Sequence, residues 1–270
     1  MKKAAAVGGG LALVLAGMAA PSPASGIPST TLAPAPASSG YTPRPLVWGA
    51  CESPTLQSFG SQCANLVVPL DYARPNGRTI TLAVSRLKHT SPDADYQGVM
   101  LANPGGPGAS GLTLSIFGQG SFIPGDGDLT YDWIGFDPRG VGSSTPALSC
   151  DPSFFGYDRP NYTPRTRALE KVWLQRSEGY AKACRRSDAA ALLPHMKTTD
   201  NVADMESLRK ALGESQINYY GFSYGTYLGQ VYASLHPNRV RRFVWDGVVN
   251  PARAWYAANL DQDKAFQKTI

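Results

Sequence analysis

Short apolar runs with the character of β-strands recur along the chain. Residues 79–87 alternate between apolar and polar positions, as in a strand with one buried face, and residues 98–102 form a continuous run typical of a buried strand. A Pro-Asn-Gly turn signal at residues 75–77 separates the first two runs and predicts that they pair antiparallel. The predicted strands are 64–70, 79–87, 98–102, 131–136, 217–220 and 242–245.

Helical patterns alternate with the later strands. They cover residues 165–187, residues 199–213 with a cap at residues 199–201, and a segment that follows Ser223 and ends at residues 236–237. Strands that alternate with helices are the mark of a mostly parallel sheet with crossover helices. The sequence therefore predicts the α/β class.

The first residues have the pattern of a secretory signal. Lys2 and Lys3 precede a short apolar stretch rich in alanine and glycine, which favours a cleaved signal over a stable membrane span. We expect the signal and the start of a Pro/Ala/Ser-rich tether in residues 1–37, a linker in residues 38–45, and the folded domain in residues 46–270.

Composition and charge narrow the class of protein. The chain of 270 residues is 43% hydrophobic and 17% charged, which is typical of a globular domain and not of a disordered chain. The net charge of +5 comes from scattered basic residues without a long run, so we expect no nucleic-acid partner.

Four cysteines agree with export to an extracellular location, where an even count suggests two disulfides. Of the three pairings that four cysteines allow, Cys51–Cys63 and Cys150–Cys184 are favoured because each pair brackets one irregular segment. The alternative is four buried free thiols. No Cys/His spacing is typical of zinc, and we expect neither a metal nor another cofactor.

The string Gly221-Phe222-Ser223-Tyr224-Gly225 lies between a predicted strand and a predicted helix. In that context a glycine-flanked serine at a sharp turn projects its hydroxyl outward, as a nucleophile must. The alternative is a glycine-rich turn with a bystander serine.

A second glycine-rich loop, at residues 103–110, directly follows the buried strand at residues 98–102. Glycines there allow a backbone N–H to approach a substrate carbonyl and, with the N–H of Tyr224, to form an oxyanion hole. An ordinary turn is the alternative.

For Asp137 and Arg139, in the loop after the next strand, we favour a structural role in an ion pair and turn over a catalytic one.

Together these strings resemble the α/β-hydrolase fold, and more narrowly the secreted tripeptidyl aminopeptidases of actinobacteria, relatives of the proline iminopeptidases. The motifs are N-P-G-G-P-G, D-P-R-G-x-G-x-S and G-x-S-Y-G, in the expected order, and the similarity runs from about residue 46 to residue 250. The resemblance implies that Ser223 is the nucleophile and that Tyr224 with Gly106, or Gly105, supplies the oxyanion N–H groups.

The remainder of a catalytic triad is not recognisable. The family's order is Ser, Asp, His, yet the chain ends at Ile270, 34 residues after His236. A helix of roughly 10 residues would place His236 about 15 Å from Ser223. Asp246 is a candidate for the acid of the triad, but we expect it to be a residue at the end of a strand without a catalytic role. The pattern predicts a chain truncated before the lid and the last strands, with the base and acid in a missing C-terminal half.

Three hypotheses about function follow from the sequence. The first is a secreted serine peptidase that releases short peptides from free N-termini through an acyl-enzyme, weakly active or inactive in this truncated form. The second is an esterase of the same fold acting on small esters. The third is a non-catalytic fragment, or one half of a split protein that needs a partner chain.

Overall fold

The computed structural model describes residues 40–269. The predicted signal and most of the predicted tether lie outside these residues. Within them, no helix combines the length and apolar character that crossing a membrane requires.

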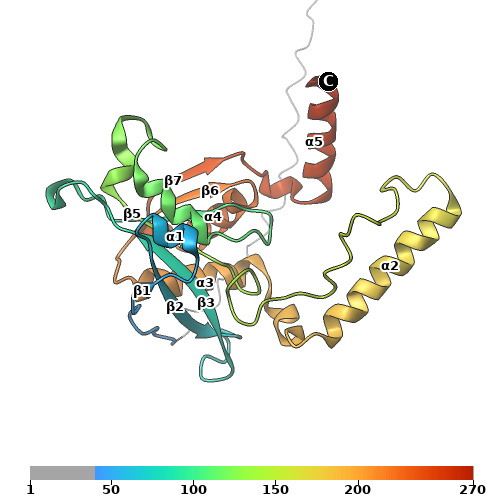
Figure 1. The fold of residues 1–270 in the computed structure, drawn as a ribbon, viewed down its shortest axis with the longest axis horizontal. Helices are drawn as coiled ribbons and strands as arrows, with labels where there is room; N and C mark the ends of the chain where they lie inside the picture. The colour runs from blue at the N-terminus through green and yellow to red at the C-terminus, as the bar shows by residue number, and fades with distance from the viewer. Residues whose placement is uncertain (1–39, 270) are drawn as a thin grey trace, which may run out of the picture. The chain divides into compact units, whose positions relative to one another are not determined.

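A mixed sheet of seven strands organises the described residues (Figure 1), in the order β1-β2-β3-β5-β4-β6-β7. Strands β5, β4, β6 and β7 run parallel, while β1, β2 and β3 pair antiparallel and β3 joins β5 antiparallel. The strands are β1 (Gly49–Ala50), β2 (Gln62–Pro69), β3 (Thr79–Leu87), β4 (Val99–Asn103), β5 (Asp132–Phe136), β6 (Ile217–Phe222) and β7 (Val240–Asp246).

All six predicted strands are confirmed, and the antiparallel pairing of the first two is confirmed as well. The bounds of β3 match the predicted run because its alternation begins and ends at turn residues. The two-residue strand β1 has no counterpart among the predicted strands. It is too short to show a period of two, and it forms only by pairing with β2.

Helices cover both faces of the sheet. The α-helices are α1 (Pro54–Ser58), α2 (Arg167–Arg186), α3 (Thr198–Ala211), α4 (Tyr224–Leu235) and α5 (Tyr256–Thr269), and the longest 3₁₀ helix is η2 (Leu112–Gln119). Leu101 of β4 packs in a core shared with Leu208 of α3 and Leu228 of α4. Its neighbours Met100 and Ala102 pack in a second core beside η2, because successive side chains of a strand point to opposite faces.

The start of α3 differs from the prediction. The residue that caps the helix is Lys197, whose backbone N–H donates to Oδ2 of Asp200 at 2.9 Å. Asp200 therefore lies in the first turn, where its charge complements the helix dipole, and not at the cap. The end matches, because Gly213 adopts a φ of +78° that favours glycine.

Both favoured disulfides are present. Cys51 is bonded to Cys63, which fastens the segment containing α1 to β2, and Cys150 is bonded to Cys184, which ties the loop after β5 to α2. No free cysteine remains among the described residues.

His89 links the end of β3 to the start of β5. Its Nδ1 lies 2.7 Å from Oδ1 of Asp132, its Nε2 lies 3.3 Å from Oδ1 of Asp93, and its ring packs on Tyr96. The hydrogen bond with Asp132 is the main cause that raises the pKa of His89 above its ordinary value of 6.5. Because the folded pKa is the higher one, this contribution to stability is full below pH 6.5 and is lost as pH rises through the folded pKa.

We expect His89→Gln to lower Tm by about 1 to 3 °C at pH 6, since a partly exposed ion pair contributes little. The deficit should shrink as pH rises from 7 to 9. Thermal unfolding of both proteins at pH 6, 7, 8 and 9 measures it, and a deficit that grows with pH would contradict the assignment.

Candidate active site

The chain makes a sharp turn at Ser223, between the end of β6 and the first residue of α4. Ser223 has φ 50° and ψ −121°, a strained conformation for a residue with a side chain, and it is exposed. The turn is held by backbone hydrogen bonds: the N–H of Ser223 donates to the carbonyl of Asp246 at 3.0 Å, and the N–H of Thr226 donates to the carbonyl of Ser223 at 2.9 Å. This geometry directs the Ser223 side chain away from the sheet.

The two glycines of the motif are required by close packing. A Cβ on Gly221 would lie 2.6 Å from the carbonyl oxygen of Gly225, and a Cβ on Gly225 would lie 2.6 Å from that of Asn103. No side chain fits at either position, because both contacts are with backbone atoms.

The loop after β4 packs directly against this turn. A Cβ on Gly105 would lie 2.4 Å from the carbonyl oxygen of Phe222 and 2.8 Å from the backbone nitrogen of Tyr224. Gly105 and Gly106 have φ values of +92° and +108°, which favour glycine. The structure therefore packs Gly105 against the turn that carries Ser223, with Gly106 next to Gly105 in the loop and Tyr224 next to Ser223 in the chain.

Hydrogen bonding distinguishes the two candidate glycines. The N–H of Gly105 donates to Oδ1 of Asn103 at 3.0 Å, whereas the N–H of Gly106 has no partner among the described residues. Tyr224 occupies the first position of α4, where an N–H has no acceptor within the helix and the helix dipole favours negative charge. The N–H of Tyr224, directly after Ser223, and the N–H of Gly106, in the loop that packs on the turn, are thus both without an acceptor among the described residues.

Asn103 supports the site although no role was predicted for it. It is the last residue of β4, is 1% exposed, and holds the loop through the bond to Gly105. The available signal in the sequence is its position, directly after the run predicted as a buried strand and two residues before the first of the paired glycines.

Asp137 and Arg139 do not pair with each other. Asp137 accepts hydrogen bonds from the backbone N–H groups of Gly111 and Ser143, which fastens the loops after β4 and β5 together. Arg139 is 1% exposed and forms a two-bond ion pair with Asp204 of α3. The structural role that we favour agrees with these contacts, but the partner of Arg139 was not predicted.

None of the three histidines forms a hydrogen bond with Ser223, whose hydroxyl makes no hydrogen bond within residues 40–269. His89 is hydrogen-bonded to Asp132, His236 packs on Tyr232, and the backbone carbonyl of His195 accepts a hydrogen bond from Arg139.

Asp246 is exposed and accepts a hydrogen bond from the hydroxyl of Tyr220. The same described residues contain no cluster of three or more side chains suited to a metal ion.

Aromatic rings lie on both sides of the turn. Phe222 contacts Phe122 at a ring-centroid distance of 6.3 Å, and Tyr224 stacks on Trp255 at 5.7 Å. Trp255 is 49% exposed, so it presents an apolar surface to solvent close to Ser223. No role was predicted for Trp255, since nothing in the local sequence pattern indicates that it reaches α4.

Comparison with known proteins agrees with this geometry. A family model described as the alpha/beta hydrolase fold matches residues 98–270. The chain belongs to that family. Within it, this α/β-hydrolase is 44% identical over 210 residues to a tripeptidyl aminopeptidase of Streptomyces lividans, an alignment that covers 76% of this chain and 39% of the relative.

Two further relatives come from Mycobacterium tuberculosis. Serine protease Hip1 is 35% identical over 236 residues, covering 83% of this chain and 43% of its own length. Carboxylesterase B is 36% identical over 229 residues, covering 82% of this chain and 43% of its own length. The α/β-hydrolase chain therefore spans about two fifths of the length of these relatives.

Proposed function

We propose that this chain carries the nucleophile and oxyanion hole of a serine hydrolase of the peptidase type. The observation that supports the proposal most strongly is the conformation of Ser223, a strained and exposed serine between β6 and α4. Strain of this kind persists only where the surrounding structure imposes it. Here Gly221, Gly225 and the carbonyl of Asp246 impose it.

The proposed chemistry is acyl transfer. Oγ of Ser223 attacks the substrate carbonyl while a base takes its proton, and the leaving group departs with that proton. Water then hydrolyses the acyl-enzyme, which releases the acid and restores the Ser223 hydroxyl. The N–H groups of Tyr224 and Gly106 stabilise the negative oxygen of each tetrahedral intermediate, and the N-terminus of α4 adds to the effect. Loss of one such donor typically costs about 3 kcal/mol. Gly105 is a weaker candidate donor, because its N–H is already bonded to Asn103.

A serine hydroxyl needs a base to become a good nucleophile. We propose that none of His89, His195 and His236 is that base, since none of them is hydrogen-bonded to Ser223 and the rings of His89 and His236 lie against Asp132 and Tyr232. The described residues alone are therefore expected to react slowly.

The proposed substrates are peptides with a free N-terminus, because relatives of this chain include a tripeptidyl aminopeptidase and a serine protease. The second candidate is ester hydrolysis, which the similarity to carboxylesterase B favours. We propose that the protein acts outside the cytosol, as its two disulfides support.

Single-turnover labelling separates these candidates without requiring a complete catalytic cycle. A tripeptidyl phosphonate with a free amino terminus is expected to label the chain at least tenfold faster than its acetylated counterpart. Faster labelling by a simple alkyl phosphonate than by either tripeptidyl reagent would favour the esterase. Equal rates for the free and acetylated tripeptides would contradict the aminopeptidase assignment.

A further inference from the structure

A broad groove lies on the antiparallel part of the sheet, away from Ser223. Its volume is about 1190 Å³, above the range of roughly 300 to 1,000 Å³ for sites that enclose small ligands. In the sheet order, β3 lies three strands from β6, which is about 14 Å at the usual strand spacing. The groove is therefore separate from the proposed oxyanion hole.

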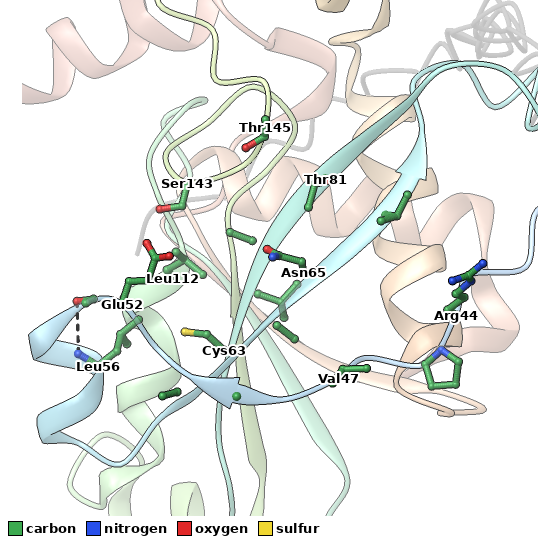
Figure 2. Close-up of a pocket in the computed structure, with 18 of the residues that line it drawn as sticks. Arg44, Val47, Glu52, Leu56, Cys63, Asn65, Thr81, Leu112, Ser143 and Thr145 are labelled. Atoms are coloured by element: carbon green, nitrogen blue, oxygen red, sulfur yellow. Dashed lines mark hydrogen bonds between the residues drawn. The ribbon is translucent and has the colours of Figure 1, made fainter.

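The floor of the groove is the outward face of the β2–β3 hairpin (Figure 2). Asn65 and Val67 of β2 lie opposite Ala83 and Thr81 of β3, and all four line the groove. Val67 is 48% exposed although the residues on either side of it in β2 are buried. The floor thus offers one amide, one hydroxyl and aliphatic surface, which together suit a peptide backbone with small side chains.

The two ends of the groove carry opposite charges. Figure 2 shows Glu52 at one end and Arg44 at the other, with Asn65 and Thr81 between them. Neither charged side chain forms an ion pair within residues 40–269, and both are exposed. A ligand of a single charge sign, such as a nucleotide or an anionic lipid, matches only one end. A peptide with a basic end and an acidic end matches both.

The length of the floor sets the size of the ligand. Cys63 and Val67 both line the groove and are four residues apart in β2, or about 13 Å at the rise of a strand. We infer that the groove binds an extended peptide segment of about four to six residues, with its positive end at Glu52 and its negative end at Arg44.

The position of the groove indicates which part of a substrate it holds. Leu112 lies at the Glu52 end and directly follows the loop that packs against the Ser223 turn. A polypeptide running away from the scissile bond would reach this end first and would place its carboxyl terminus toward Arg44. This orientation rests on the proposed peptidase function, whereas peptide binding by the groove does not.

Fluorescence anisotropy with two labelled hexapeptides tests the inference. Both have blocked termini and a centre of valine, threonine and alanine; one carries lysine and aspartate at its ends, and the other carries two lysines. Binding is measured in the Ser223→Ala background, so that hydrolysis cannot contribute. We expect Arg44→Glu to weaken binding of the mixed peptide by about fivefold and to strengthen binding of the two-lysine peptide by a similar factor.

Lys171→Glu is the matched control, because Lys171 is an exposed cation on α2 that does not line the groove. It should change neither affinity. Absence of saturable binding of the mixed peptide at millimolar concentration would overturn the inference, as would equal effects of the two variants. A dimer that Arg44→Glu dissociates, seen by light scattering, would also overturn it, because a second copy would then fill the groove.

The groove and the peptidase assignment can fail separately. Peptide binding by the groove does not depend on Ser223, whereas phosphonate labelling does. If the free and acetylated tripeptidyl phosphonates label at equal rates while the groove still binds the mixed peptide, only the peptidase assignment is refuted. If the preference for the free tripeptide is intact but the mixed peptide does not bind, only peptide binding by the groove is refuted.

Discussion

Gly105→Ala is expected to slow phosphonate labelling of Ser223 by about a hundredfold or more. The new Cβ would meet the carbonyl oxygen of Phe222 at 2.4 Å and the nitrogen of Tyr224 at 2.8 Å, so the loop must move away from the turn. That movement would displace the N–H of Gly106 from the developing negative oxygen. Removal of a single oxyanion donor costs a factor of roughly 10² to 10³ in comparable enzymes. Second-order labelling rates of the two proteins measure the effect.

Gly108→Ala is the matched control, because Gly108 lies in the same loop and also has a positive φ, +100°. A Cβ there meets nothing within 4 Å, so this variant carries the backbone strain without the clash. We expect it to label within a few-fold of the original rate. Comparable losses in both variants would show that loop strain, and not the contact with Tyr224, controls reactivity.

Asp204→Ala is expected to lower the stability of the protein strongly. Asp204 is 2% exposed and accepts hydrogen bonds at 2.7 Å from Nε and Nη2 of Arg139, as well as one from the hydroxyl of Tyr72. Removing one partner leaves a buried charge uncompensated, which typically costs about 3 to 5 kcal/mol, or a Tm lower by about 6 to 20 °C at this size. Calorimetry at pH 7 measures the change.

A double variant tests whether the lower Tm comes from the charge of Arg139 that is left buried without a partner. Arg139→Met combined with Asp204→Leu should recover part of the Tm, because a buried pair replaced by apolar residues is often tolerated. Recovery should be incomplete, since the carbonyls of Leu70 and His195 would lose the Arg139 guanidinium. The exposed pair between Lys182 and Glu178 is the comparison, and its removal should leave Tm nearly unchanged. An equal decrease in Tm for the single and double variants would show that the unpaired charge of Arg139 is not the cause.

The strands and the Ser223 turn could be predicted because their signals are local. The alternation in β3 and the glycines flanking Ser223 are visible within a few residues, and each agrees with what precedes and follows it in the chain. The favoured disulfides rest on a similarly simple argument, and both are present.

Features that depend on distant contacts could not be predicted. Arg139 meets Asp204 across 65 residues, and nothing in either segment identifies the other as its partner. The choice between Gly105 and Gly106 depends on where the side chain of Asn103 points, which only the folded loop determines. The helix η2 was not predicted either, because a 3₁₀ segment lacks the period of 3.6 residues on which helix signals depend.

Mass-spectrometric mapping of a fluorophosphonate adduct shows directly whether Ser223 is the nucleophile. We expect a single major adduct on the peptide that contains Ser223, absent in Ser223→Ala and retained in Ser234→Ala, which changes an exposed serine at the far end of α4. An adduct distributed over several serines, or one that persists in Ser223→Ala, would contradict the assignment of Ser223 as the nucleophile.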